Sequence, residues 1–219
     1  MKKWIGCGVL ALMAVACSAP LRPTLQNPAP TSASVEDLAA AIASDAKRSD
    51  RESDSKIRGD LAADASRDAQ ACIAREPQTA ACLYGRAVAL GLEARVHPTR
   101  AGELLNNMLG SLASADAADP NYDQAGPARV RGLVLIRAPG WPLGPGDAEA
   151  GLVAARRAAT LQPQYPPNLL ALAEALAKTG DANGARENYQ RARDLAQALP
   201  ASSDRDDWLR EAEQALKHK

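Results

Sequence analysis

Residues 167–192 read PNLLALAEALAKTGDANGARENYQRA, and this stretch decides the fold. Apolar residues recur every three or four positions on both sides of the Gly180-Asp181 pair, which is the period of one face of an α-helix. The pair itself is typical of a tight turn, because glycine permits a sharp reversal of the backbone. The stretch therefore predicts two helices that fold back on each other.

The pattern in the second of these helices occurs four times along the chain. Pro77, Pro120 and Pro163 each end a helical run, and they are spaced 43 residues apart. Small or medium-sized residues stand twelve, eight and five positions before each proline, and the fourth copy keeps this spacing without the proline. The recurring residues are Ala65, Ala69 and Cys72; Met108, Leu112 and Ala115; Gly151, Ala155 and Ala158; and Ala185, Tyr189 and Ala192.

This spacing resembles the second helix of a tetratricopeptide (TPR) repeat. The last copy lies 34 residues after the preceding one, the usual length of a TPR, while the earlier two units are nine residues longer. The resemblance implies an all-α, TPR-like solenoid of helical hairpins with about nine helices. A generic amphipathic helical bundle is the alternative, because an apolar stripe on each helix gives a similar pattern.

The helical pattern covers most of the chain after residue 34. The last expected helix has apolar residues on one face and charged residues on the other, so we expect it to cap the end of the solenoid. Its apolar face consists of Trp208, Leu209, Ala212, Ala215 and Leu216. The expected helices are 34–48, 55–75, 79–94, 99–117, 125–138, 147–161, 166–179, 182–198 and 204–217.

The N-terminus resembles that of a bacterial lipoprotein. Two lysines precede an apolar run of twelve residues, which is shorter than the roughly 20 residues of a membrane-spanning helix. Residues 14–17, AVAC, resemble a lipobox, although Ala14 stands where leucine is usual. We therefore expect a signal peptide at 1–16 and a lipid on Cys17. The alternative is an ordinary secreted protein with a chance cysteine near the cleavage point.

The segment that follows predicts a tether and a location. Ser18 rather than aspartate follows the cysteine, which favours the outer over the inner membrane of a periplasm-facing, lipid-anchored protein. Pro20, Pro23, Pro28 and Pro30 favour an extended backbone. We expect three parts: the signal peptide, a lipidated and proline-rich tether at 17–34, and a TPR-like domain with a C-terminal capping helix at 35–219.

Two cysteines of the helical region are placed to form a disulfide. Cys72 and Cys82 stand five residues before and after Pro77, where one helix is expected to turn into the next. An exported protein enters an oxidising compartment, in which such a pair forms a disulfide. Two buried thiols are the alternative. A metal site is not expected, because neither His97 nor His218 lies near the pair.

Residues 137–147, RAPGWPLGPGD, interrupt the helical pattern with prolines and glycines. Eight residues, 139–146, stand where a regular TPR needs only a short turn. Prolines fix the backbone and glycines allow reversals, so this loop should have one definite shape. Trp141 has two interpretations. It either folds back to fill a gap between alanine-rich helices or forms part of a surface for a partner or ligand.

The stretch 122–176 also resembles the T-component (TatT-like) lipoproteins of TRAP transporters. The resemblance implies a periplasmic helical lipoprotein with TPR-like motifs. It also implies that the protein acts together with a solute-binding protein that captures small organic acids or hydrophobic ligands. The matching residues are Ala125, Gly126, Pro127 and Arg129 at a helix start, Ala138 to Pro142 in the loop, and then Gly146, Asp147 and Pro163.

Composition and motifs favour binding over catalysis. The chain has 26 basic and 26 acidic residues and no basic stripe, which argues against nucleic acid as a partner. It contains no nucleophile elbow, zinc-protease motif, P-loop or dinucleotide-binding motif. We therefore expect no enzyme activity, no cofactor and no metal.

The leading hypothesis is a lipid-anchored scaffold whose groove, lined by the first helix of each hairpin, binds a protein partner. A TRAP-type solute-binding protein is the partner that the resemblance implies. The alternatives are a carrier of small hydrophobic ligands or organic acids and a scaffold for outer-membrane or envelope assembly, and homo-oligomerisation stays open. The candidate surface residues, which could equally be solubilising charges, are Tyr84, Arg86, Arg129, Arg131, Arg137 and Trp141.

Overall fold

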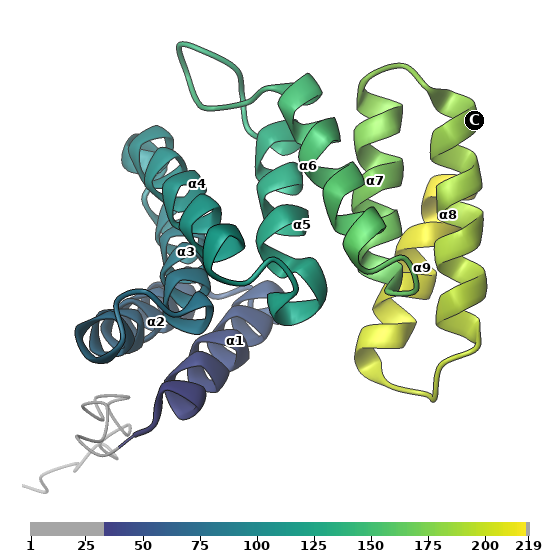
Figure 1. Ribbon diagram of the computed structural model, residues 1–219. Coiled ribbons are helices and arrows are strands. Elements are labelled where there is room, and N and C mark those ends of the chain that lie inside the picture. The colour runs from purple at the N-terminus through teal and green to yellow at the C-terminus, as the bar shows by residue number, and fades with distance from the viewer. Residues whose placement is uncertain (1–32, 218–219) are drawn as a thin grey trace, which may run out of the picture.

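The computed structural model describes residues 33–217 of the 219-residue chain, and within this range it contains nine α-helices, one 3-10 helix and no β-strand (Figure 1). The predicted all-α fold is thereby confirmed. The expectations for the signal peptide, for the lipid on Cys17 and for almost all of the tether lie outside the described residues.

The helices lie close to where the sequence predicts them. Expected and observed ends differ by at most three residues. The elements are α1 (Val35–Arg51), α2 (Ser55–Arg75), α3 (Ala80–Val96), η1 (Pro98–Arg100), α4 (Ala101–Ala118), α5 (Tyr122–Arg137), α6 (Ala148–Leu161), α7 (Pro166–Lys178), α8 (Ala182–Gln197) and α9 (Ser203–Lys217).

Successive helices pack against each other, and a second set of contacts gives the molecule its form. The odd-numbered helices also touch in order, α1 with α3, α3 with α5, α5 with α7 and α7 with α9. Within residues 33–217, the backbones of the even-numbered helices do not pack on one another, although Arg157 of α6 forms an ion pair of 3.1 Å with Asp116 of α4. The odd-numbered helices therefore form one continuous row, and α2, α4, α6 and α8 cover it from outside, as can be followed in Figure 1.

The small residues that recur in the sequence are the packing surface of the even-numbered helices. Of the twelve, eleven are buried and Tyr189 is half-buried. Glycine brings α5 and α6 into direct backbone contact: a Cβ atom on Gly132 would lie 3.0 Å from the backbone nitrogen of Ala155. Small side chains thus let the two helices of this pair approach closely, as the sequence predicts.

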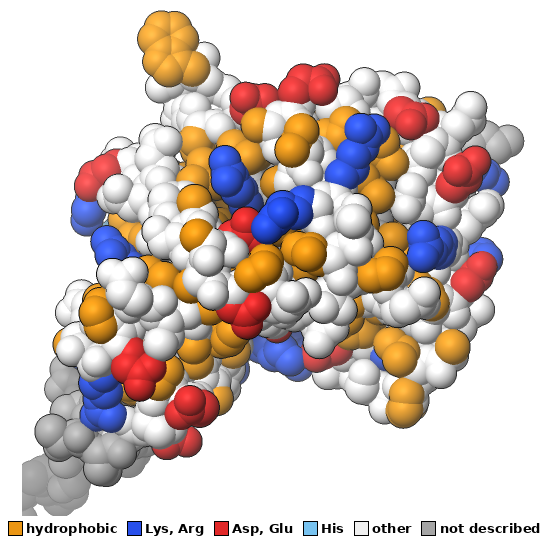
Figure 2. Space-filling view, in the orientation of Figure 1, with side chains coloured by type: hydrophobic (Ala, Val, Ile, Leu, Met, Phe, Trp, Pro, Cys, Tyr) orange, Lys and Arg blue, Asp and Glu red, His pale blue; other side chains and the backbone are white. Residues whose placement is uncertain are grey.

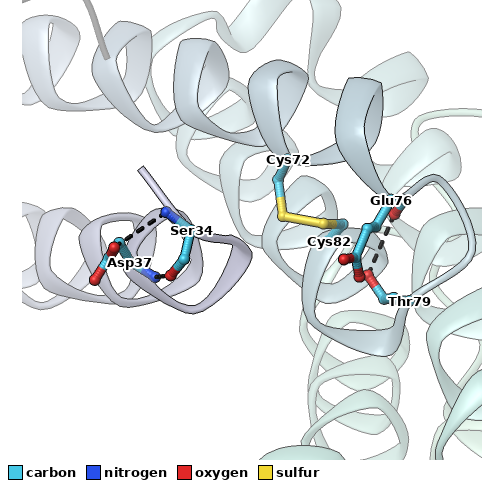
Figure 3. The surroundings of a disulfide bond; sticks show 6 residues. All are labelled: Ser34, Asp37, Cys72, Glu76, Thr79 and Cys82. Atoms are coloured by element: carbon cyan, nitrogen blue, oxygen red, sulfur yellow. Dashed lines mark hydrogen bonds between the residues drawn. A yellow bond between two sulfur atoms is a disulfide. The ribbon is translucent and has the colours of Figure 1, made fainter. Parts of the chain in front are cut away.

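The disulfide predicted between Cys72 and Cys82 is present and joins α2 to α3 across their short turn (Figure 3). The two Cα atoms are 5.2 Å apart, and both side chains are fully buried. Ala33 and Leu38 pack on this bridge from the start of α1. The disulfide therefore lies where the described chain begins, beside the first helix.

The C-terminal helix covers one end of the row. Ala212 of α9 is fully buried and packs in one cluster with Leu169 and Leu170 of α7 and Ala192 of α8. Trp208 joins the same cluster from the expected apolar face. None of the helices within residues 33–217 combines the length and the apolar composition needed to cross a membrane.

The loop between α5 and α6 projects from the body, and hydrophobic atoms stand at its tip (Figures 1 and 2). Its base is closed by hydrogen bonds from the amide of Gly146 to the carbonyl of Pro139 and from Asp147 to Leu135, both 2.9 Å. The side chains of Trp141 and Leu143 are 91% and 77% exposed. The interpretation that Trp141 fills a gap between helices is therefore wrong, because the loop's own hydrogen bonds direct its tip outward.

Candidate functional site

A cleft with a volume of about 510 Å³ lies among the five odd-numbered helices. Three of the four tyrosines in the chain, Tyr84, Tyr122 and Tyr165, line it together with Trp208. Aromatic residues make up only 3% of the chain, so their convergence on one cavity singles it out. We call this cavity the aromatic cleft. A hollow of about 690 Å³ along α1 alone brings no such residues together.

The aromatic side chains come from α3, α5, α9 and the residue that precedes α7, and they form two pairs. Tyr84 of α3 meets Tyr122 of α5 edge to face, with ring centroids 5.5 Å apart. Tyr165, which precedes α7, meets Trp208 of α9 in the same way and at the same distance. Each edge-to-face pair contributes about 0.5–1.5 kcal/mol beyond its buried area. The pairs thus hold successive odd-numbered helices in place around the cleft.

The chain enters α5 through a left-handed turn that contains no glycine. Asp123, Gln124 and Ala125 have φ angles of 47°, 56° and 62°. This conformation costs about 1–2 kcal/mol for each non-glycine residue, so other interactions must stabilise it. The carbonyl oxygens of Asp123 and Gln124 both accept hydrogen bonds of 3.2 Å from the guanidinium of Arg129.

Arg129 and Asn168 form the buried centre of this arrangement. Their exposed fractions are 8% and 0%. Arg129 donates to the Asp123 carboxylate at 2.8 Å and to the side-chain oxygen of Asn168 at 3.1 Å, and it lies over the ring of Tyr165. The Asn168 amide nitrogen donates to the carbonyls of Gln124, Ala158 and Gln162. A buried cation is tolerated only when it is paired in this way.

Tyr84 completes the network by donating from its hydroxyl to the Asp123 carboxylate at 3.0 Å. Burial, reinforced by this carboxylate, raises the pKa of Tyr84 well above its usual value, so the hydroxyl stays a donor. Burial likewise raises the pKa of Tyr122 and Tyr165. Within the described chain, neither the Tyr122 nor the Tyr165 hydroxyl has a protein hydrogen-bond partner.

Charged residues at the cleft are mostly paired. Lys47 of α1 and Asp204 near the start of α9 form an ion pair of 2.8 Å, and Arg95 pairs with Asp50. The lining contains three carboxylates, from Asp50, Asp123 and Asp204, and two cations. The cleft therefore combines aromatic walls with three carboxylates that are each paired with a cation.

The structure does not bring the six predicted surface residues together. Tyr84 and Arg129 line the aromatic cleft, whereas Arg86 lines a separate hollow of about 410 Å³ between α2 and α3. Arg131 is exposed on α5. Arg137 forms an ion pair with Glu174, with its Nε atom 2.8 Å from a carboxylate oxygen. Trp141 lies at the tip of the projecting loop.

Most residues of the cleft carry no recognisable signal in the sequence. Tyr122, Asp123, Tyr165 and Asn168 were not singled out, and Trp208 was interpreted only as part of a cap. One signal was available: Asn168 is a polar residue directly before the apolar run of α7. The cleft is lined by α1, α3, α5 and α7, the first helix of each expected hairpin, and also by α9, which was expected only as a cap.

The described residues contain no group of histidine, cysteine and carboxylate side chains that could hold a metal ion. The cleft instead presents aromatic rings, tyrosine hydroxyls and carboxylates, which suit noncovalent recognition. In comparisons with known proteins, no family model matches the sequence, and no curated protein matches it significantly.

Proposed function

We propose that this chain is a noncatalytic binding protein that recognises a protein partner in the aromatic cleft. The observation that carries the proposal is the convergence of Tyr84, Tyr122, Tyr165 and Trp208, from four parts of the chain, on one cavity. Tyrosine and tryptophan are enriched among the residues that dominate binding energy at protein interfaces, because they bury a large area and also form hydrogen bonds.

We further propose that the helices form a TPR-like solenoid. Three observations support this: small residues recur at fixed spacing and are buried, first helices form a continuous row, and second helices cover that row. In such solenoids, the surface formed by the first helices is concave and extended. An extended segment of a partner is therefore the natural occupant of the cleft.

The location in the cell is part of the proposal. A lipid on Cys17 would anchor the protein at an envelope membrane, facing the periplasm, and Ser18 favours the outer membrane. Several acyl chains together anchor a protein stably. The resemblance to TRAP T-component lipoproteins makes a TRAP-type solute-binding protein the first partner to test.

The test uses substitutions at two cleft tyrosines. Tyr122→Ala and Tyr165→Ala each remove an aromatic wall, and we expect each to weaken binding of a purified candidate solute-binding protein at least tenfold. Val153→Ala is the control, because it removes an exposed apolar side chain that does not line the cleft. Isothermal titration calorimetry measures the affinities. Unchanged affinity in both tyrosine variants would contradict recognition through the cleft.

A carrier of small organic ligands is a second candidate, favoured by the volume of the cleft. At about 510 Å³ it lies within the roughly 300–1,000 Å³ of typical small-molecule sites. Native mass spectrometry of the protein purified from its own envelope separates the two functions. A stoichiometric small molecule that is lost in Tyr165→Ala supports the carrier, and a stoichiometric protein supports the scaffold.

A further inference from the structure

We propose that two ion pairs between the first and the last helix form a clasp that closes the aromatic cleft, and that a partner must open this clasp to enter. The ion pairs join Lys47 to Asp204 and Arg51 to Asp207, from α1 to α9. The inference rests on the proposed function, because it assigns a control of access to the same site.

The two ion pairs lie one helical turn apart on each helix. The Lys47 ammonium is 2.8 Å from a carboxylate oxygen of Asp204, and the Arg51 guanidinium is 3.5 Å from one of Asp207. Residues three or four positions apart share a face of a helix, so a basic face of α1 meets an acidic face of α9 in register. The helix dipoles reinforce this match, because Arg51 is in the last turn of α1 and Asp204 is in the first turn of α9.

Neither backbone packing nor an apolar cluster joins these two helices. Within the described residues, α1 packs on α2 and α3, whereas α9 packs on α7 and α8. No buried apolar cluster in this part of the chain contains residues of both α1 and α9. The row of odd-numbered helices therefore has two ends that meet through charged side chains.

The clasp stands at the aromatic cleft itself. Lys47 and Asp204 are part of the lining of the cleft, as is Trp208, one turn further along α9. The rest of the wall comes from α3, from α5 and from the start of α7, and these three helices pack on one another in order. The side between α1 and α9 is thus the one that can part without loss of packing between helices, and parting it widens the cleft.

The clasp is weak enough to open. Its four side chains have exposed fractions between 39% and 62%, and exposed ion pairs contribute little to stability because water and salt screen them. Asp207 also pairs with Arg210 of its own helix, so its carboxylate keeps a partner when α9 moves away from α1. A ligand that binds only the open form has its affinity reduced by the fraction of molecules that are closed.

Carbodiimide cross-linking of the intact protein measures how often the clasp is closed. The reagent condenses a lysine amine with a carboxylate that touches it and takes up the water that is lost. An amide between Lys47 and Asp204 therefore forms only in the closed state. Lys56 and Asp60, 2.9 Å apart within α2, are the matched control, because one helix holds both. Mass spectrometry of the digested protein gives the yield of each cross-link.

Salt should act on the two cross-links differently. Raising sodium chloride from about 0.1 M to about 1 M shortens the Debye length from about 10 Å to about 3 Å. We expect the yield of the Lys47–Asp204 cross-link to fall at least threefold relative to that of the Lys56–Asp60 cross-link. An equal change in both yields would overturn the clasp, because salt would then act on ion pairs in general and not on the separation of α1 from α9.

Substitution of the second ion pair tests the clasp without touching the cross-linked residues. Arg51→Gln changes a residue outside the lining of the cleft and should lower the Lys47–Asp204 yield at least twofold. Arg95→Gln is the matched control, because it removes an exposed ion pair with Asp50 between two helices that also pack by their backbones. It should leave the yield unchanged. Equal yields in Arg51→Gln and Arg95→Gln would refute the clasp.

The same two variants test control of access. Arg51→Gln should raise the affinity for the purified candidate solute-binding protein about threefold, because more molecules are open before binding. Arg95→Gln should leave the affinity unchanged. Isothermal titration calorimetry measures both. If Arg51→Gln binds no more tightly than Arg95→Gln, the partner does not have to open the clasp.

The two proposals can fail separately. If the Lys47–Asp204 yield responds neither to salt nor to Arg51→Gln while Tyr165→Ala still weakens partner binding, the clasp is wrong and the proposed function stands. If the yield responds as expected but the tyrosine variants bind the partner normally, the proposed function is wrong. The clasp then opens and closes a cleft that this partner does not use.

Discussion

Asn168 lies fully buried before the first turn of α7 is complete, and its amide joins three parts of the chain. Its oxygen accepts from Arg129, and its nitrogen donates to the carbonyls of Gln124, Ala158 and Gln162. A single side chain thereby stabilises the left-handed turn, the end of α6 and the buried guanidinium. Buried polar networks of this kind are costly to leave partly unsatisfied.

Asn168→Ala should therefore lower the free energy of unfolding by about 2–3 kcal/mol, because it leaves Arg129 and three carbonyl groups short of a partner. Urea unfolding followed by circular dichroism measures the change. Asn183→Ala, at an exposed position of α8, is the control and should change stability by no more than about 0.5 kcal/mol. Equal effects of the two substitutions would contradict the role of Asn168.

Gln124→Gly should raise the free energy of unfolding, whereas Asn168→Ala should lower it. Gln124 has a φ of 56°, and its exposed side chain makes no hydrogen bond or ion pair within the described residues. Relief of the left-handed strain should stabilise the protein by about 0.5–1 kcal/mol. Gln70→Gly, within the regular helix α2, should instead destabilise it by about 1 kcal/mol. Destabilisation by both would show that the turn is not strained in solution.

The left-handed turn is a feature that the local sequence does not predict. Asp123, Gln124 and Ala125 include no glycine, the residue that usually signals this conformation. The turn forms because Arg129 and Asn168 bind its carbonyl groups, and Asn168 lies far along the chain. Local sequence carries no signal of that contact, so the cleft that the turn borders could not be foreseen.

At the scale of helices, the sequence was informative because small residues and prolines act locally. Pro77, Pro120 and Pro163 each stand two residues after the end of a helix, and alanine or glycine at fixed spacing requires a close neighbour. Helix positions, the buried small residues and the pairing of Cys72 with Cys82 follow from such signals. The direction of Trp141 does not, because it depends on hydrogen bonds that close the loop.

The contact between α5 and α6 can be tested with two glycines of opposite environment. Gly132→Ala should destabilise the protein by about 1–3 kcal/mol, because its Cβ would press against the backbone of α6. Gly110→Ala on α4 is the matched control: its Cβ would meet no atom within 4 Å, so the higher helix propensity of alanine should stabilise the protein by about 1 kcal/mol. Thermal unfolding of both variants measures the difference, and stabilisation by Gly132→Ala would show that the helices are not in close contact.

The stability of the whole molecule depends on pH through carboxylates whose surroundings shift their pKa values in opposite directions. Burial raises the pKa of Asp68 on α2, and the neighbouring Asp64 raises it further. Hydrogen bonding to Arg210 lowers the pKa of Asp207 on α9. A raised pKa means that ionisation opposes folding, so the loss of stability at Asp68 develops as the pH rises above about 3.8.

Asp68→Asn should therefore raise the melting temperature at pH 7, and the gain should vanish below about pH 3.5, where the native aspartate is protonated. Asp207→Asn is the control and should lower the melting temperature slightly at pH 7, because it removes a favourable charge contact. Melting curves recorded between pH 3 and pH 7 provide the comparison. A gain for Asp68→Asn that does not depend on pH would contradict the electrostatic explanation.

The unequal contacts of the two sets of helices have a mechanical consequence. Contacts run unbroken through α1, α3, α5, α7 and α9, whereas the backbones of α2, α4, α6 and α8 stay apart in the described chain, with an ion pair of 3.1 Å between Arg157 of α6 and Asp116 of α4. Bending that spreads or gathers these four helices breaks no backbone packing among them and strains only side-chain contacts such as this ion pair, so we expect it to meet little resistance. Such bending changes the width of the aromatic cleft, which lies on the opposite side of the row. The cleft can thus accommodate ligands of different width while every helix stays intact.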